Sequence, residues 1–171
     1  SEAFHFIPML IAASLFPAIV SAKKQNQELF FFRQQSLYTL LFWLAILLCL
    51  PMSLSSDLLI SLLFGEPFKE AGPILQINIW GSIFVFLGVA STKWYVAENL
   101  QKFLFYNTAI GALLNVMLNF YLIPKFGVIG AAYSTVLSQF VAAYFINLFW
   151  KPTRPNFFMM SKCAWQIRKS F

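Results

Sequence analysis

Charged residues divide the chain into five long runs that contain no Asp, Glu, Lys or Arg. The runs cover residues 3–22, 34–56, 71–92, 103–124 and 126–150, and the shortest has 20 residues. About 20 apolar residues in a helix cross the roughly 30 Å hydrocarbon core of a bilayer. None of the runs has the charged face that a surface helix of a soluble protein shows. The pattern therefore predicts an all-α integral membrane protein with about five transmembrane helices.

Proline and glycine mark where the predicted helices bend or end. Pro124 and Gly127 separate the fourth run from the fifth so closely that we expect a helical hairpin there. Pro8 and Pro17 lie inside the first run and are expected to kink it. The basic tail, residues 151–171, allows two readings: a frayed terminus, or a short interfacial helix on the anionic inner leaflet.

The distribution of lysine and arginine predicts the orientation. If all five runs cross the membrane, ten of the twelve basic residues fall on one side, in the 23–33 loop, the 93–102 connection and the tail. The positive-inside rule then places these segments, and the C-terminus, in the cytoplasm. The formal net charge of +6 therefore reports membrane orientation and does not indicate a nucleic-acid partner.

Composition supports a membrane protein and gives no sign of an enzyme. Hydrophobic residues make up 60% of the chain and charged residues 11%, too few charges to form the polar shell of a soluble domain. The lone histidine and six acids form no catalytic or metal-ligand cluster, so we expect no catalytic residue, metal or cofactor. The chain starts at Ser1 with an apolar run, which we interpret as a segment of a longer protein.

Polar residues inside the runs are the candidate site residues. Asn107, Gly111, Asn115 and Asn119 recur every fourth position and form one stripe along a helix. The stripe either hydrogen-bonds to a neighbouring helix, with close approach at Gly111, or lines part of a polar path for a sugar. Gln139 is a further candidate for this path.

Two basic residues near the predicted cytoplasmic ends carry a similar ambiguity. Lys93 and Arg33 either reach to the inner headgroups or point into a central cavity, where they would attract an anionic substrate.

Three segments in order resemble the polysaccharide flippases of the multidrug/oligosaccharidyl-lipid/polysaccharide flippase superfamily. The first is the Pro17-Ala18-Ile19 element that ends the first run. The second is the outer turn Leu63-Phe64-Gly65-Glu66-Pro67-Phe68-Lys69-Glu70-Ala71. The third runs from Asn115 and Asn119 through Leu122-Ile123-Pro124 to Gly127 and Gly130-Ala131-Ala132.

The resemblance implies a C-terminal part of a roughly twelve-helix transporter that lacks its N-terminal bundle. The implied function is alternating-access transfer of undecaprenyl-diphosphate-linked oligosaccharides from the inner to the outer leaflet, for O-antigen or capsule assembly. The implied location is the bacterial inner membrane. The implied partners are that lipid-linked oligosaccharide, membrane lipids, the missing bundle and a polysaccharide polymerase complex. A multidrug exporter, a non-transporting assembly subunit and a membrane glycosyltransferase or ligase remain as alternatives.

Overall fold

A computed structural model describes residues 5–56, 60 and 71–165, and helices dominate these residues. The long helices are α1 (Phe6–Gln25), α2 (Gln27–Leu54), α4 (Ala71–Ala97) and α5 (Gln101–Ala143). All four are long and apolar enough to cross a membrane. Three short elements follow: η3 (Phe145–Leu148), η4 (Lys151–Thr153) and α6 (Arg154–Lys162). The prediction of an all-α membrane fold is confirmed, whereas the quoted outer turn, residues 63–70, lies outside the described residues.

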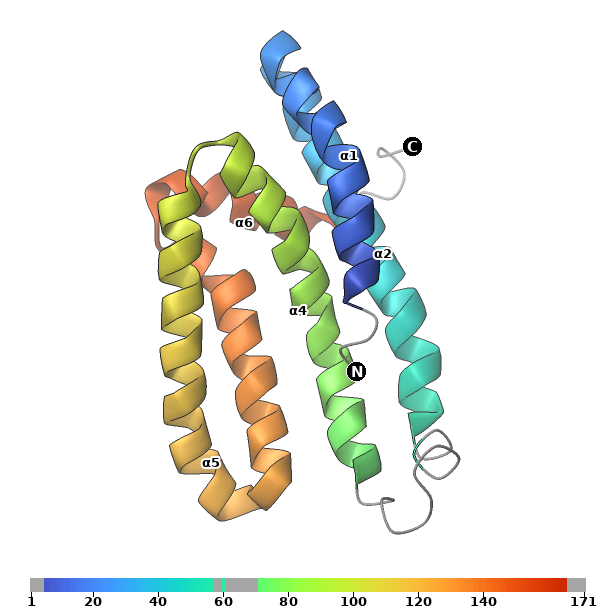
Figure 1. Ribbon diagram of the computed structural model, residues 1–171, viewed down its shortest axis with the longest axis vertical. Coiled ribbons are helices and arrows are strands. Elements are labelled where there is room, and N and C mark those ends of the chain that lie inside the picture. Colours follow the sequence, from blue (N-terminus) through green and yellow to red (C-terminus); the bar gives the residue numbers. More distant parts are fainter. Residues whose placement is uncertain (1–4, 57–59, 61–70, 166–171) are drawn as a thin grey trace.

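α5 consists of two antiparallel limbs rather than one rod (Figure 1). The chain reverses at Gly127, whose φ of 58° and ψ of −139° leave the helical region. Such a backbone conformation is essentially restricted to glycine. Next to this turn, a Cβ added at Gly130 would lie 2.4 Å from the carbonyl oxygen of Leu122. The reversal lies at the predicted Pro124–Gly127 hairpin, and with it the four long helices trace five limbs.

The connection between α1 and α2 is shorter than the charge pattern predicts. Only Asn26 interrupts the helix, with φ −155° and ψ 134°. Its side-chain oxygen accepts a hydrogen bond from the backbone N–H of Glu28 at 2.9 Å, which caps α2. α2 therefore begins at Gln27 and not near residue 34, because charged side chains at the end of a membrane helix do not by themselves end it.

α4 is the central helix and packs against α1, α2 and α5, whose returning limb lies beside it (Figure 1). The core between α1, α2 and α4 contains large buried side chains, among them Phe30, Leu41, Phe86 and Trp94. Many large apolar side chains on the outer faces are exposed, including Leu47, Leu113 and Phe120. A hydrocarbon environment suits such faces.

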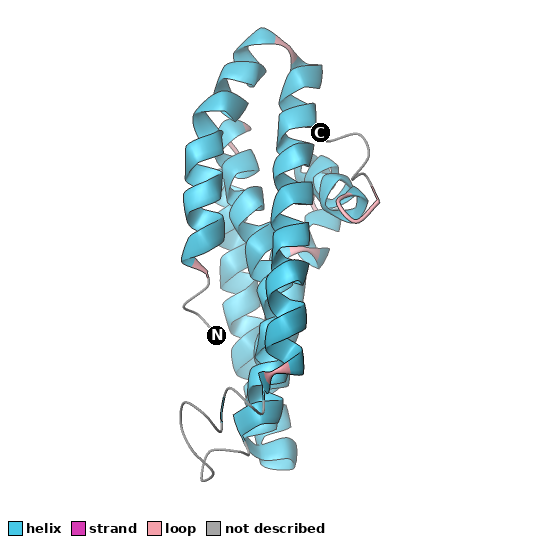
Figure 2. Ribbon diagram, turned by 90° about the vertical axis from the view of Figure 1, so that its right-hand side faces the viewer, coloured by secondary structure: helices cyan, strands magenta, loops and turns pink. Residues whose placement is uncertain are grey.

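The last predicted run, residues 126–150, is α-helical only as far as Ala143. Asn147 donates from its carboxamide to the carbonyl oxygens of Ala143 and Tyr144, and the chain then continues as η3. Side chains that bond to nearby carbonyls compete with regular helix in this way. η4 and α6 follow, and α6 runs across the long axes of the other helices (Figures 1 and 2). Over residues 151–165 the tail is folded, so the frayed-terminus reading is wrong for this part.

One end of the bundle collects basic side chains, and we call it the basic end. It is the end at which α1 and α4 finish and α2 and α5 begin (Figure 1). Lys23, Lys24, Lys102 and Lys151 lie there, whereas Lys125 lies at the opposite end, in the α5 hairpin.

Candidate functional site

A buried cluster of hydroxyl and carboxamide groups joins five elements near the basic end. It consists of Tyr38 on α2, Ser91 and Tyr95 on α4, Asn107 on α5, Asn147 on η3 and Asn156 on α6. Each of these residues is at most 2% exposed. We call them the polar cluster.

Asn156 and Asn147 form the centre of the polar cluster. Asn156 accepts from the Tyr38 hydroxyl, donates to Ser91 Oγ, and donates to Asn147 Oδ1 at 3.1 Å. Asn147 Oδ1 also accepts from the Tyr95 hydroxyl, which in turn accepts from Asn107 Nδ2 at 2.7 Å. Buried polar groups are strongly destabilising unless they are paired, so this network fixes the C-terminal segment to the bundle.

The polar cluster holds structure together and carries no reactive pair. Its members are phenol, hydroxyl and carboxamide groups, without a histidine, a carboxylate or a cationic group. Among the described residues, no group of three or more His, Cys, Asp or Glu side chains could hold a metal ion. Only Asn107 was a predicted site residue. Among the other members, Asn147 has a signal in the sequence, because it is a carboxamide within the apolar stretch Phe145–Trp150.

The polar stripe of α5 faces the returning limb of the same hairpin. Asn115 Nδ2 donates to Ser138 Oγ at 3.1 Å, and Asn119 Nδ2 donates to Asn115 Oδ1 at 3.0 Å. Between Asn107 and Asn115, a Cβ added at Gly111 would lie 2.5 Å from Ala142 Cβ. The predicted close approach at Gly111 is therefore present, and these contacts are those of the helix-packing alternative.

Gln139 lies on the other side of the returning limb, against α4. Its Oε1 would lie 2.9 Å from a Cβ added at Gly81, so the absence of a side chain at Gly81 makes room for it. Gln139 therefore packs between α5 and α4, away from the Asn115–Ser138 contact.

The two candidate cations both contact α1, close to Pro17. Lys93 Nζ lies 5.3 Å from the centroid of the Phe16 ring, a cation–π contact. Arg33 Nη1 donates to the carbonyl oxygen of Ala18 at 2.5 Å. Neither has a carboxylate within ion-pair distance in the part of the chain that the structure describes. The structure thus places these cations beside one helix and away from the carboxamide stripe.

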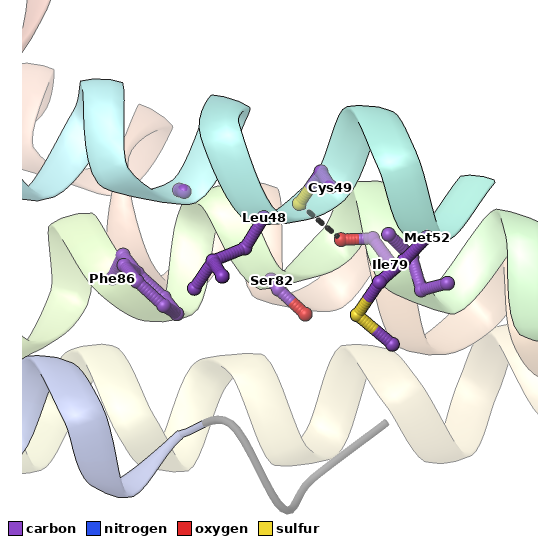
Figure 3. Close-up of a pocket in the computed structure, with 7 residues that line it drawn as sticks. Leu48, Cys49, Met52, Ile79, Ser82 and Phe86 are labelled. Carbon is purple, nitrogen blue, oxygen red and sulfur yellow. Dashed lines mark hydrogen bonds between the residues drawn. The ribbon is translucent and has the colours of Figure 1, made fainter. Parts of the chain in front are cut away.

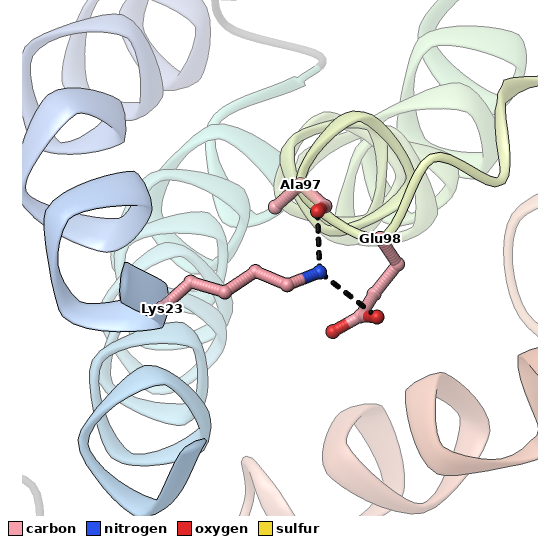
Figure 4. A network of polar contacts seen from close by, with 3 residues as sticks. All are labelled: Lys23, Ala97 and Glu98. Carbon is pink, nitrogen blue, oxygen red and sulfur yellow. Dashed lines mark hydrogen bonds and ion pairs between the residues drawn. The ribbon is translucent and has the colours of Figure 1, made fainter. Parts of the chain in front are cut away.

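Among the described residues, an ion pair joins Lys23 to Glu98 at the basic end (Figure 4). Lys23 Nζ lies 3.0 Å from Glu98 Oε2 and donates to the carbonyl oxygen of Ala97 at 2.5 Å. Because Lys23 belongs to the last turn of α1 and Glu98 follows α4, the pair ties these two helix ends together.

A small cavity lies between α2 and α4 (Figure 3). It measures about 10 Å³, room for one water at most. Its lining is mostly apolar, and Cys49 Sγ donates to the carbonyl oxygen of Ile79 at 3.1 Å beside it. This cavity is too small to hold a sugar.

Two larger hollows are open to the surroundings. A groove of about 690 Å³ runs along α2 beside Ile11 and is lined almost entirely by apolar side chains, including Trp43 and Leu47. A depression of about 340 Å³ lies on the first limb of α5, where Asn119 meets Phe120 and Pro124. The groove suits hydrocarbon, whereas the lining of the depression includes one carboxamide residue, Asn119.

Comparison with known proteins gives one family match over nearly the whole chain. Residues 3–168 match the family described as lipid II flippase MurJ. The chain is 33% identical over 97 residues to the uncharacterized membrane protein MJ1068 of Methanocaldococcus jannaschii, covering 55% of this chain and 18% of that protein. It is 32% identical over 95 residues to the capsular polysaccharide biosynthesis protein CapF of Staphylococcus aureus, covering 56% and 24%. Each alignment thus spans less than a quarter of the relative's length, and no solved structure matches.

Proposed function

Since the chain belongs to the lipid II flippase family MurJ, we propose that it forms part of a transporter that moves undecaprenyl-diphosphate-linked oligosaccharide repeat units across a membrane. The direction would be from the inner to the outer leaflet, for O-antigen or capsule assembly. The family is one of transporters, so the prediction that the chain is not an enzyme is confirmed. The capsular polysaccharide biosynthesis protein CapF among the relatives favours a surface-polysaccharide unit as the cargo.

The observation that supports the proposal most directly is the position of two cations, Lys93 and Arg33. Both are partly buried cations on membrane-length helices, and neither has a carboxylate partner within the described residues. A cation within a bilayer is costly unless a counter-charge or water meets it. The diphosphate of a lipid-linked oligosaccharide would supply that negative charge. We assign Lys93 and Arg33 to the diphosphate in this proposal.

The carboxamides have a different part in the proposal. Asn107 and Asn115 bond within the bundle, and Gln139 packs against Gly81, so they would keep the bundle rigid while it moves as a unit. Asn119 lies at the open depression on α5 and is the carboxamide that we assign to the sugar path. Alternating access needs two such rigid bundles that rock against each other. The second would come from the N-terminal half of the protein.

The proposal also covers the membrane in which the transporter lies and its orientation there. Five limbs of apolar helix and the family match indicate a multi-pass membrane protein. We propose the bacterial inner membrane, with the basic end and the C-terminus in the cytoplasm, because basic residues are retained on that side. A polysaccharide polymerase complex would then receive the transferred unit on the opposite face.

Lipid II itself is a second candidate cargo, favoured by the family description. It shares the polyprenyl diphosphate that Lys93 and Arg33 would bind, and it differs in the sugar. A cation-coupled multidrug exporter is a weaker alternative. Its cationic substrates would be repelled by Lys93 and Arg33.

The test is deletion of the intact gene in its own host, with mass spectrometry of extracted lipids and an assay of surface polysaccharide. We expect a lipid-linked repeat unit to accumulate and the surface polymer to disappear. The intact gene should restore both, whereas K93Q/R33Q and N119L forms that still insert should not. Lys102→Gln is the matched control, because Lys102 is an exposed cation that contacts the ring of Phe103 at the basic end.

The lipid that accumulates separates the alternatives. Accumulation of lipid II with loss of peptidoglycan synthesis would favour the second cargo. Unchanged lipid pools with increased drug sensitivity would favour an exporter. Unchanged lipids, polymer and drug sensitivity would contradict transport altogether and leave a non-transporting assembly subunit.

A further inference from the structure

Helix α6 has two faces of opposite character. Asn156, Met159, Met160 and Cys163 are buried against the bundle. Arg154, Phe158 and Lys162 follow one another at intervals of four residues, which places them on one side of the helix. Trp165 follows in the turn after α6, and all four residues are exposed. We call these four residues the outer face of α6. It alternates cationic and aromatic side chains.

The position of α6 along the bundle matches the headgroup region of a membrane. Asn156 bonds to Ser91, which lies six residues before the end of α4 at Ala97, about 9 Å at 1.5 Å per residue. On α2, Gln35 Nε2 donates to the carbonyl oxygen of Met159 at 3.0 Å. α6 runs across the long helices at this depth (Figures 1 and 2). Helices that bind a membrane surface lie in the plane of the interface about 5–10 Å deep.

Within the part of the chain that the structure describes, no acidic side chain neutralises the charges of the outer face. Arg154 Nε donates to the carbonyl oxygen of Leu148 at 3.1 Å, which leaves its terminal N–H groups free to bind an anion. Lys162 has no ion-pair partner in the part of the chain that the structure describes. Of the described acids, Glu98 is paired with Lys23, and Glu28 lies in the first turn of α2. The outer face is therefore complementary to a negatively charged surface.

We propose that the outer face of α6 binds the headgroups of anionic phospholipids in the leaflet at the basic end. Arg154 and Lys162 would contact lipid phosphates, while Phe158 and Trp165 lie among the glycerol and upper acyl groups, where aromatic rings are favoured. The polar cluster already fixes α6 to α2 and α4, so the surface is ordered before the lipid binds. Preorganisation of this kind lowers the entropic cost of binding.

The test places a fluorescent dye on α6 and asks which lipid lies next to it. Ser161 is exposed, so the intact protein carrying Ser161→Cys is labelled, while Cys49 and Cys163 are buried and protected. The labelled protein is placed in nanodiscs that contain nitroxide-labelled phosphatidylglycerol or nitroxide-labelled phosphatidylcholine. We expect phosphatidylglycerol to quench the dye at a lower lipid fraction. Each removed charge should reduce this preference about fivefold, and high salt should weaken it.

The variants are R154Q/K162Q, the single change K162Q, and the control K125Q, which removes a charge at the opposite end of the bundle. We expect the single variant K162Q to fold, because Lys162 is exposed and makes no ion pair with the described residues. Its result can therefore be interpreted even if the double variant does not fold. The proposal requires loss of preference in the double variant, partial loss in K162Q and none in K125Q. Equal quenching by the two lipids, or a preference that survives in R154Q/K162Q, would overturn it. Quenching by neither lipid would overturn it as well and would show that protein covers the face.

Discussion

The hydroxyl of Tyr38 donates a hydrogen bond to Oδ1 of Asn156, although 118 positions separate the two residues in the chain. Both side chains are fully buried. The bond joins α2 to the last helix of the described chain, and Asn156 extends the connection to Ser91 on α4 and Asn147 on η3. One carboxamide thus satisfies polar groups from three other elements.

Replacement of Asn156 by leucine should release the C-terminal segment. Leucine has a similar volume but leaves the Tyr38 hydroxyl and Ser91 without this partner, at a cost of about 1–3 kcal/mol for a buried unsatisfied group. We expect a lower unfolding temperature and faster proteolysis within residues 151–165. Lys162→Gln on the exposed side of the same helix is the control and should change stability by less than about 0.5 kcal/mol. Equal protease resistance of Asn156→Leu and the parent would contradict the role of the polar cluster.

The sequence predicted the helices well because each apolar run lacks charges over a membrane-spanning length. It also predicted the close approach at Gly111, since a small residue in a polar stripe favours tight packing. It did not predict the ends of the runs. Asn147 ends the regular helix through contacts with carbonyls four and three residues back, and Asn156 bonds to partners brought together only by the complete fold. Contacts between distant segments leave no periodic signal in the chain.

The candidate site was predicted as a set of residues but not as an arrangement. Lys93 and Arg33 were singled out as cations in apolar surroundings, yet their shared contact with α1 near Pro17 depends on how three helices pack. The stripe on α5 left two readings open, because its spacing is the same whether it faces a helix or water. In the structure Asn115 donates to Ser138 across the hairpin, a contact that no spacing within one helix could predict.

A methyl group at Gly111 should push the two limbs of α5 apart. Its carbon would lie 2.5 Å from Ala142 Cβ, which is far inside van der Waals contact, so we expect Gly111→Ala to cost about 1–3 kcal/mol. The second change Ala142→Gly removes the clashing atom and should restore much of the loss. The measurement is unfolding in a detergent titration. Gly88→Ala is the matched control, because its added carbon would meet Ala143 Cβ at an ordinary 3.5 Å. Similar losses in both glycine variants would argue against a specific close approach.

The Lys23–Glu98 ion pair should contribute little to stability and should depend on salt. The two side chains are 29% and 22% exposed, so water screens part of the attraction. A double-mutant cycle with Lys23→Gln and Glu98→Gln should give a coupling free energy of at most about 1 kcal/mol, smaller at high ionic strength. A coupling free energy well above about 1 kcal/mol that does not respond to salt would contradict this expectation.

The thiol of Cys163 should be unreactive in the folded protein. Burial against the bundle raises its pKa to about 12 from an ordinary value of 9.0. Since the thiolate is the reactive form, maleimide labelling at pH 8 should be slow until the protein is unfolded. Between about pH 9 and 12 the unfolded chain releases this proton and the folded chain keeps it, so stability should fall as the pH rises. The fall should be smaller in Cys163→Ala, and an identical pH dependence in both proteins would contradict this assignment.

The polar cluster also has a consequence for the order in which the protein is made. Contacts within the α5 hairpin, such as Asn115 with Ser138, join residues 23 positions apart and become available soon after the second limb is synthesised. Tyr38, Ser91 and Tyr95, in contrast, depend on Asn147 and Asn156, which leave the ribosome last among the members of the cluster. Until then three polar groups of already inserted helices lack their final partners, a costly state in an apolar surrounding. The basic end of the bundle can therefore close only after the chain has been synthesised as far as Asn156.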